Sequence, residues 1–200
     1  MNDVIMYHCD PGRSGAAPGA PAHSTWHKLW QIDLPAHPPN PTGNAVRGAP
    51  LFLGGWTFSK GPARGQTHDV VVFAASDNHV YAYADGPTPS LLWSTFIGLA
   101  LNSTGSNIPP PVGVAGTPFL DLANRRMFVV SLQDNGAGVG GYHAVCLDID
   151  TGAILHSAPL ADPGAPGRPT FDGSTVDQRG GLNFANGFLF VTFADFLAFR

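Results

Sequence analysis

Apolar and polar residues alternate along the chain in short stretches typical of β-strands. Residues 70–75 form a continuous apolar run, residues 76–78 have the composition of a turn, and residues 79–83 alternate. An apolar run joined to an alternating stretch by a short turn predicts a β-hairpin. Residues 127–130 and 143–147 repeat this pattern around a Gly-rich loop, so a second hairpin is expected there.

The turn expected at residues 148–152 has side chains suited to a tight reversal of the chain. Asp148 and Asp150 can bond their own backbone, and Gly152 accepts a positive φ. Asp77, in the turn of the first hairpin, has the same character. We therefore interpret these three acids as turn residues rather than metal ligands.

Two landmarks recur along the sequence. A large ring follows apolar residues at Trp30, Trp93 and His156, and both intervals are 63 residues. A Gly-x-Pro stretch leads into apolar residues at 48–52 and returns 68 residues later at 116–120, with a third copy that lacks the proline at 180–184. Such periods indicate a series of similar structural units.

The units predict an all-β fold of the β-propeller class. Each unit has four strands, and inner strands that are apolar on both sides suit a blade packed between two neighbours. Common propeller repeats have roughly 40 to 50 residues, so the excess is assigned to loops at 98–114 and 134–141. The propeller is incomplete, because only about two and a half to three four-stranded blades are present and propellers close with about 4 to 8.

The expected organisation follows from these landmarks. Residues 1–27 are an N-terminal extended segment, and residues 28–200 are a partial propeller. Within it lie the outer strand of a closing blade (28–34), blade 1 (47–98), blade 2 (112–162) and the start of blade 3 (178–200). An open array exposes strand edges. We expect other blades of a longer protein to cover them, with a second copy of the chain as the alternative.

Composition narrows the possible functions. Charged residues make up 12% and hydrophobic residues 44% of the 200 residues, and 10 Lys+Arg against 14 acids, all Asp, give a net charge of -4. This mild acidity, without a basic run, argues against nucleic acid or an anionic membrane as partner. With 25 Gly, 19 Pro and no Glu, a helical bundle is disfavoured.

Compartment and redox state are less constrained by the sequence. Cys9 and Cys146 match no zinc or redox spacing, and two buried thiols are favoured over a disulfide. No signal peptide or membrane span is recognisable, because no basic stretch followed by an apolar run opens the chain.

Several motifs spread over nearly the whole chain carry a family resemblance. They include the opening Tyr-His-x-Asp-x-x-Arg-x-Gly at 7–15, the two Gly-x-Pro stretches, the alternating stretch at 79–83 and the Asp-Ile-Asp-Thr-Gly turn at 148–152. With these motifs the chain resembles the PQQ-repeat-like (quinoprotein-type) β-propeller family, in particular the N-terminal part of large bacterial members. It departs from the family at His156, which replaces a Trp, and at the turn of residues 85–89. The resemblance implies a closed ring in the full-length protein and an extracytoplasmic or secreted location.

The resemblance also suggests two functions. Quinoprotein dehydrogenases hold PQQ with a calcium ion and often carry a vicinal disulfide, whereas this chain has no Glu and no adjacent cysteines. We therefore expect a non-catalytic propeller segment that acts as a binding or interaction scaffold. The alternative is part of a quinoprotein-like redox or hydrolytic enzyme whose site is completed by further blades, and PQQ with calcium is expected only in that case.

Four side chains are candidate ligand-binding residues at the mouth of a propeller channel. His79 and His143 occupy matching places 64 residues apart, and Arg47 and Arg179 precede expected inner strands. These positions share one face of a propeller, where they suit a small polar or anionic ligand. The alternative is that they bond backbone carbonyls between blades. No catalytic or metal-binding residue is assigned.

Overall fold

Every regular element of the protein is a β-strand, in a computed structural model that describes residues 3–7, 28–35, 37, 44–102, 109–136, 138, 140–161 and 176–195. The predicted all-β class is confirmed. The described ranges contain no helix that is long and apolar enough to cross a membrane. Cys9 and residues 8–27 lie outside the described residues, and the Cys146 thiol is free and half-buried.

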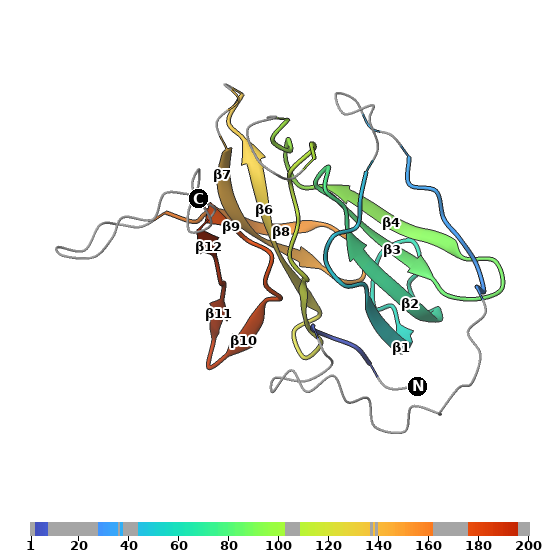
Figure 1. Cartoon of the computed structure of the whole chain (residues 1–200). Coiled ribbons are helices and arrows are strands. Elements are labelled where there is room, and N and C mark those ends of the chain that lie inside the picture. The colour runs from blue at the N-terminus through green and yellow to red at the C-terminus, as the bar shows by residue number, and fades with distance from the viewer. Residues whose placement is uncertain are drawn as a thin grey trace, which may run out of the picture.

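Two four-stranded antiparallel sheets form most of the structure, and each has its strands in chain order (Figure 1). The first sheet consists of β1 (Leu51–Thr57), β2 (Thr67–Ala74), β3 (His79–Ala84) and β4 (Ser90–Phe96). The second sheet consists of β5 (Phe119–Asp121), β6 (Arg126–Asp134), β7 (Gly140–Asp148) and β8 (Ile154–Pro159).

Four short strands follow near the C-terminus. β10 (Asn183–Ala185) pairs with β11 (Phe188–Phe190), and β12 (Ala194–Asp195) pairs with β9 (Val176–Asp177). We call residues 176–195 the C-terminal unit.

Both predicted hairpins are confirmed. Residues 70–74 of β2 pair with residues 80–84 of β3, and the chain reverses at Asn78, which has a φ of 65°. In the second hairpin β6 and β7 pair along nine residues, from Arg126↔Asp148 to Asp134↔Gly140. The tight turn after β7 is also as predicted, since Gly152 has a φ of 71°.

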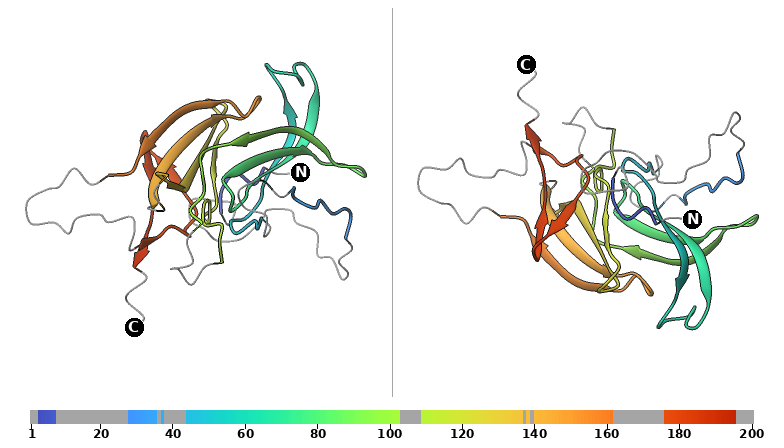
Figure 2. Two further views of the ribbon diagram at one scale, coloured as in Figure 1. Left: turned by 90° about the horizontal axis from the view of Figure 1, so that it is seen from above. Right: turned by 90° about the horizontal axis from the view of Figure 1, so that it is seen from below.

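The core is divided between two interfaces. Alternate residues of the two sheets, including Val72, Val80, Met127 and Val145, are fully buried between them. The opposite face of the second sheet packs through Phe119 and other side chains against the C-terminal unit. The three units are therefore stacked in chain order, as Figure 2 shows from above and below.

The N-terminal residues 3–7 run along β1 and β5, the first strands of the two sheets. Val4 and Phe52 exchange backbone hydrogen bonds of 2.8 and 2.9 Å, and the amide of Leu120 donates to the carbonyl of Ile5 at 3.0 Å. This segment therefore ties β1 to β5 at their N-terminal parts.

Residues 28–34, expected as an outer strand, form no strand in the structure. They are held by side chains instead: Leu34 packs near Phe73 and Tyr81, and Trp30 Nε1 donates to Asp85 Oδ1 at 2.8 Å. A strand requires a neighbouring edge to pair with. Within the described part of the chain, no strand edge is paired with this segment.

Candidate functional site

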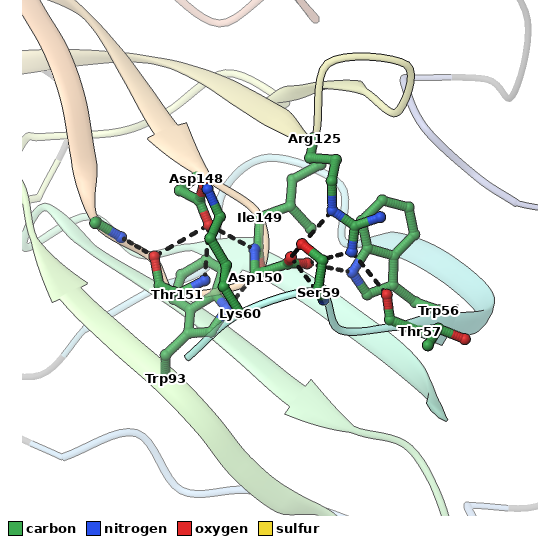
Figure 3. Close-up of polar contacts among 11 residues, drawn as sticks. Trp56, Thr57, Ser59, Lys60, Trp93, Arg125, Asp148, Ile149, Asp150 and Thr151 are labelled. Atoms are coloured by element: carbon green, nitrogen blue, oxygen red, sulfur yellow. Dashed lines mark hydrogen bonds and ion pairs between the residues drawn. The ribbon is translucent and has the colours of Figure 1, made fainter. Parts of the chain in front are cut away.

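The densest polar network of the described residues joins the two sheets, and Asp150 is at its centre (Figure 3). Its buried carboxylate accepts hydrogen bonds from Trp56 Nε1 at 2.9 Å, from Arg125 Nη2 at 2.6 Å and from the amide and hydroxyl of Ser59. Burial alone would raise the pKa of Asp150, but the bonds from Arg125, Ser59 and Trp56 outweigh it and hold the pKa at about 2. The carboxylate of Asp150 thus links residues from the region of β1 to the second sheet.

Asp148 has a similar role within its own turn. Its Oδ1 accepts from the amides of Asp150 and Thr151, both at 3.0 Å, and its Oδ2 pairs with Lys60. The neighbouring carbonyl of Ile149 accepts from Trp93 Nε1 of the first sheet at 2.8 Å. Asp148 therefore bonds its own turn, as the sequence predicts. Asp150 lies in the same turn, but its carboxylate bonds Trp56, Ser59 and Arg125 across the joint between the sheets instead.

Two of the four predicted ligand-binding residues lie close to one carboxyl group. Arg179 Nε is 2.7 Å from Asp177 Oδ2, and Arg47 is near enough to lower the pKa of Asp177. Burial is the larger effect and raises that pKa above its ordinary value. Arg47 Nη2 donates to the carbonyl of Pro109 at 2.8 Å, whereas its buried Nε has no partner among the described residues.

His79 and His143 have different surroundings. His79 begins β3, whose turn lies beside residues 44–47, because the amide of Ser76 donates to the carbonyl of Ala45 at 2.9 Å. His143 lies on β7 opposite Ser131. Among the described residues, no hydrogen bond or ion pair joins His143 to His79 or to either arginine. The structure thus pairs Arg179 with Asp177, places Arg47 on the carbonyl of Pro109 within electrostatic reach of the same carboxyl group, and places His79 with other partners.

These partners are Asp77 and His37, which the sequence analysis did not select as site residues. His37 Nδ1 and His79 Nδ1 each lie 2.9 Å from Asp77 Oδ2, and the two rings are stacked with centroids 3.7 Å apart. Burial lowers the pKa of His79, although Asp77 opposes this shift. The Asp-x-His spacing of residues 77–79 was a usable signal, because such residues beside a strand can face the same way. His37 comes from a distant Pro-rich stretch and carried no signal.

A pocket of about 520 Å³ opens on the first sheet, on the face turned away from the second sheet. Its only buried polar atom without a partner among the described residues is Asn44 Oδ1; the Nδ2 of the same side chain donates to the carbonyl of Pro35 at 2.6 Å. No local pattern predicted this pocket, because its walls come from separate stretches of sequence. They are Trp30, Ile32, Asp33, Leu34, Asn44, Val46, Pro50, Val71 and Phe73.

Comparisons of the chain with models of protein families, with curated proteins and with solved structures find no match. The physical properties of its own residues are therefore the basis for a function.

Proposed function

We propose that the protein is a segment of a β-propeller that serves as a non-catalytic binding scaffold, with a ligand site in the pocket on the first sheet. The binding role rests on one observation. The pocket has mainly apolar walls and a volume of about 520 Å³, and its lining residue Asn44 has a buried acceptor, Oδ1, without a partner among the described residues. Ligand pockets typically have about 300–1,000 Å³, apolar walls and a few well-placed polar groups.

The propeller part of the proposal is supported by contacts between repeated positions. A Cβ on Gly48 would lie 2.7 Å from the carbonyl carbon of Gly116, and a Cβ on Gly116 would lie 2.6 Å from the carbonyl oxygen of Gly180. Gly48, Gly116 and Gly180 open the repeated stretch in three successive units. Each of these glycines thus lies close to the next one. Such regularity is expected where each unit is placed on the previous one by a similar rotation.

The pocket walls indicate the chemical class of the ligand. Trp30 and Phe73 offer flat aromatic surfaces, and the indole N–H of Trp30 is already bonded to Asp85. In the part of the pocket that the structure describes, the side-chain acceptor without a partner is the Asn44 carbonyl oxygen, and leaving such a buried group unpaired costs about 1–3 kcal/mol. A flat, largely apolar molecule with one hydrogen-bond donor satisfies both features.

A matched pair of probes tests this site. Naphthol can donate its hydroxyl hydrogen to Asn44, whereas its methyl ether has the same rings and no donor. In fluorescence titrations of the full chain we expect naphthol to bind at least about fivefold more tightly than the ether, since about 1 kcal/mol separates a met from an unmet acceptor. The Asn44→Leu variant should abolish this preference.

The control variant is Asn124→Leu, because Asn124 lies at an exposed turn and bonds Asp121. It should keep the preference for naphthol. Equal affinity for the two probes, or no binding of either, would overturn the pocket as the ligand site.

A further inference from the structure

The cluster of His37, Asp77 and His79 lies beside the turn between β2 and β3. Asp77 Oδ1 accepts a hydrogen bond from the backbone amide of His79 at 3.1 Å, and its Oδ2 forms hydrogen bonds with Nδ1 of both imidazoles. The Asp77 side chain is 1% exposed, whereas those of His79 and His37 are 14% and 31% exposed. The carboxylate is thus fixed in position by its own turn, and both rings lie at the edge of solvent.

The separations within the cluster are close to those of ligands around one transition-metal ion. One ring nitrogen of His37, one ring nitrogen of His79 and a carboxylate oxygen of Asp77 all lie within 4.8 Å of one another. Two ligand atoms at about 2.0–2.1 Å from a tetrahedral ion are about 3.4 Å from each other. Both N···O distances in the cluster are 2.9 Å, the length of hydrogen bonds, so each would lengthen by about 0.5 Å around such an ion.

A buried tyrosine on the same strand is a second, independent observation. Tyr81 is two residues after His79 on β3, so both side chains face the same side of the sheet, and their ring centroids are 6.1 Å apart. Tyr81 is 2% exposed, and its hydroxyl has no hydrogen-bond partner among the described residues. A water molecule carried by a nearby ion is the kind of partner that this hydroxyl lacks.

We propose that His37, Asp77 and His79 form a binding site for one divalent ion of the zinc class. Two imidazoles and one carboxylate suit such an ion, and three protein ligands leave a position for water or another ligand. The ion would replace the hydrogens that now lie between each Nδ1 and Asp77, and each ring would carry its hydrogen on Nε2. Because a lone pair lies in the plane of its ring, the partly exposed ring of His37 would turn out of its stack with His79 to bind the same ion. It would also attach His37, which lies outside the sheets, to the first sheet.

Titration of the full chain with Zn²⁺ by calorimetry, and with Co²⁺ by visible absorption, tests the site. We expect one ion per chain, and at least about a tenfold loss of affinity in His37→Ala and in His79→Ala, because loss even of a group that only supports a ligand lowers metal affinity 10–100-fold. Zn²⁺ should also raise the Tm of the wild type and leave that of His37→Ala unchanged.

The matched control is His143→Ala, at the place that repeats His79 in the second sheet; it should change the affinity less than about twofold. Circular dichroism should show that His37→Ala keeps its β-structure, because this half-exposed side chain lies outside the sheets. Absence of binding at about 1 mM Zn²⁺ would overturn the site. Binding that persists unchanged in both His37→Ala and His79→Ala would assign the ion to other residues and also overturn it.

Discussion

At the scale of the residue, Asp150 links ionisation to the packing of the two sheets. Its side chain is fully buried and bonded to Arg125, Ser59 and Trp56, which hold its pKa at about 2 against an ordinary value of 3.8. A carboxyl whose pKa is lower in the folded state contributes stability above the unfolded pKa. That contribution is lost as the pH falls through the folded pKa.

We therefore expect the free energy of unfolding to fall by about 2 kcal/mol from this group between about pH 5 and about pH 2. Asp150→Asn should lose this part of the acid sensitivity, and at neutral pH it should be destabilised by about 3 kcal/mol, because Arg125 is left without its counter-charge. Urea unfolding followed at several pH values measures both effects.

The control for Asp150→Asn is Asp121→Asn, since Asp121 bonds only the exposed Asn124 among the contacts described for its side chain. This variant should keep the acid sensitivity of the wild type. Equal pH profiles for wild type and Asp150→Asn would show that the network at Asp150 does not contribute to acid stability.

Single residues also show which parts of the sites could be predicted from the sequence. The turn role of Asp148 was predictable, because an Asp bonds amides within a few residues of itself. The partners of Asp150, Arg125 and Trp56, were not predictable, because they come from distant stretches of the chain. Asp77 was interpreted as a turn residue, and its Oδ1 does bond the backbone of the turn. Its Oδ2 contacts two imidazoles, and this could not be predicted because His37 comes from a distant stretch of the chain.

At the scale of the element, the turn after β7 fits against β4 only because residue 152 is glycine. A Cβ at Gly152 would lie 2.5 Å from Trp93 Cε3 and 2.6 Å from Thr95 Oγ1, and the backbone has a φ of +71°. An alanine at residue 152 would therefore have a strained backbone conformation, and its Cβ would clash with Trp93 and Thr95.

We expect Gly152→Ala to lower the free energy of unfolding by about 3 kcal/mol, of which about 1 kcal/mol comes from the positive φ and the rest from overpacking. The comparison variant is Gly65→Ala, because Gly65 has a φ of +81° and open space around its Cβ position. It should lose only about 1 kcal/mol. Equal losses in chemical denaturation would mean that the Trp93 contact is not tightly packed.

Elements whose partners are neighbours in sequence were the predictable ones. The hairpins β2–β3 and β6–β7 follow from an apolar run, a turn and an alternating stretch, and their pairing needs no distant residue. Residues 28–34 have a similar pattern but form no strand. The difference is physical, because a strand depends on an available edge, and an apolar segment without one can bury side chains such as Leu34 on the face of a sheet.

At the scale of the whole molecule, the order of the three units depends on close backbone contact at repeated positions. The amide of Ala49 donates to Thr117 Oγ1 at 2.9 Å, and the amide of Leu182 donates to the carbonyl of Thr117 at 3.0 Å. Thr117 therefore contacts the units on both sides of its own. Gly48 lets the backbone of the second unit approach directly, and Gly116 leaves room for the Gln178 side chain and the carbonyl of Gly180.

Gly48 gives a direct test of this stacking. It has no positive φ, so an alanine there would be strained by steric contact with the next unit and not by its own backbone conformation. A Cβ on Gly48 would lie 2.7 Å from the carbonyl carbon of Gly116 and 2.9 Å from the amide nitrogen of Thr117, and backbone atoms cannot move aside as a flexible side chain can. We expect Gly48→Ala to lower the free energy of unfolding by about 3 kcal/mol in urea titrations.

The control is Gly141→Ala on β7, where nothing lies within 4 Å of the Cβ position. That variant should be neutral or stabilised by up to about 1 kcal/mol, because alanine restricts the unfolded chain. A neutral Gly48→Ala would mean that the units are not held at this distance, and the support for a propeller from the repeated glycines would be lost.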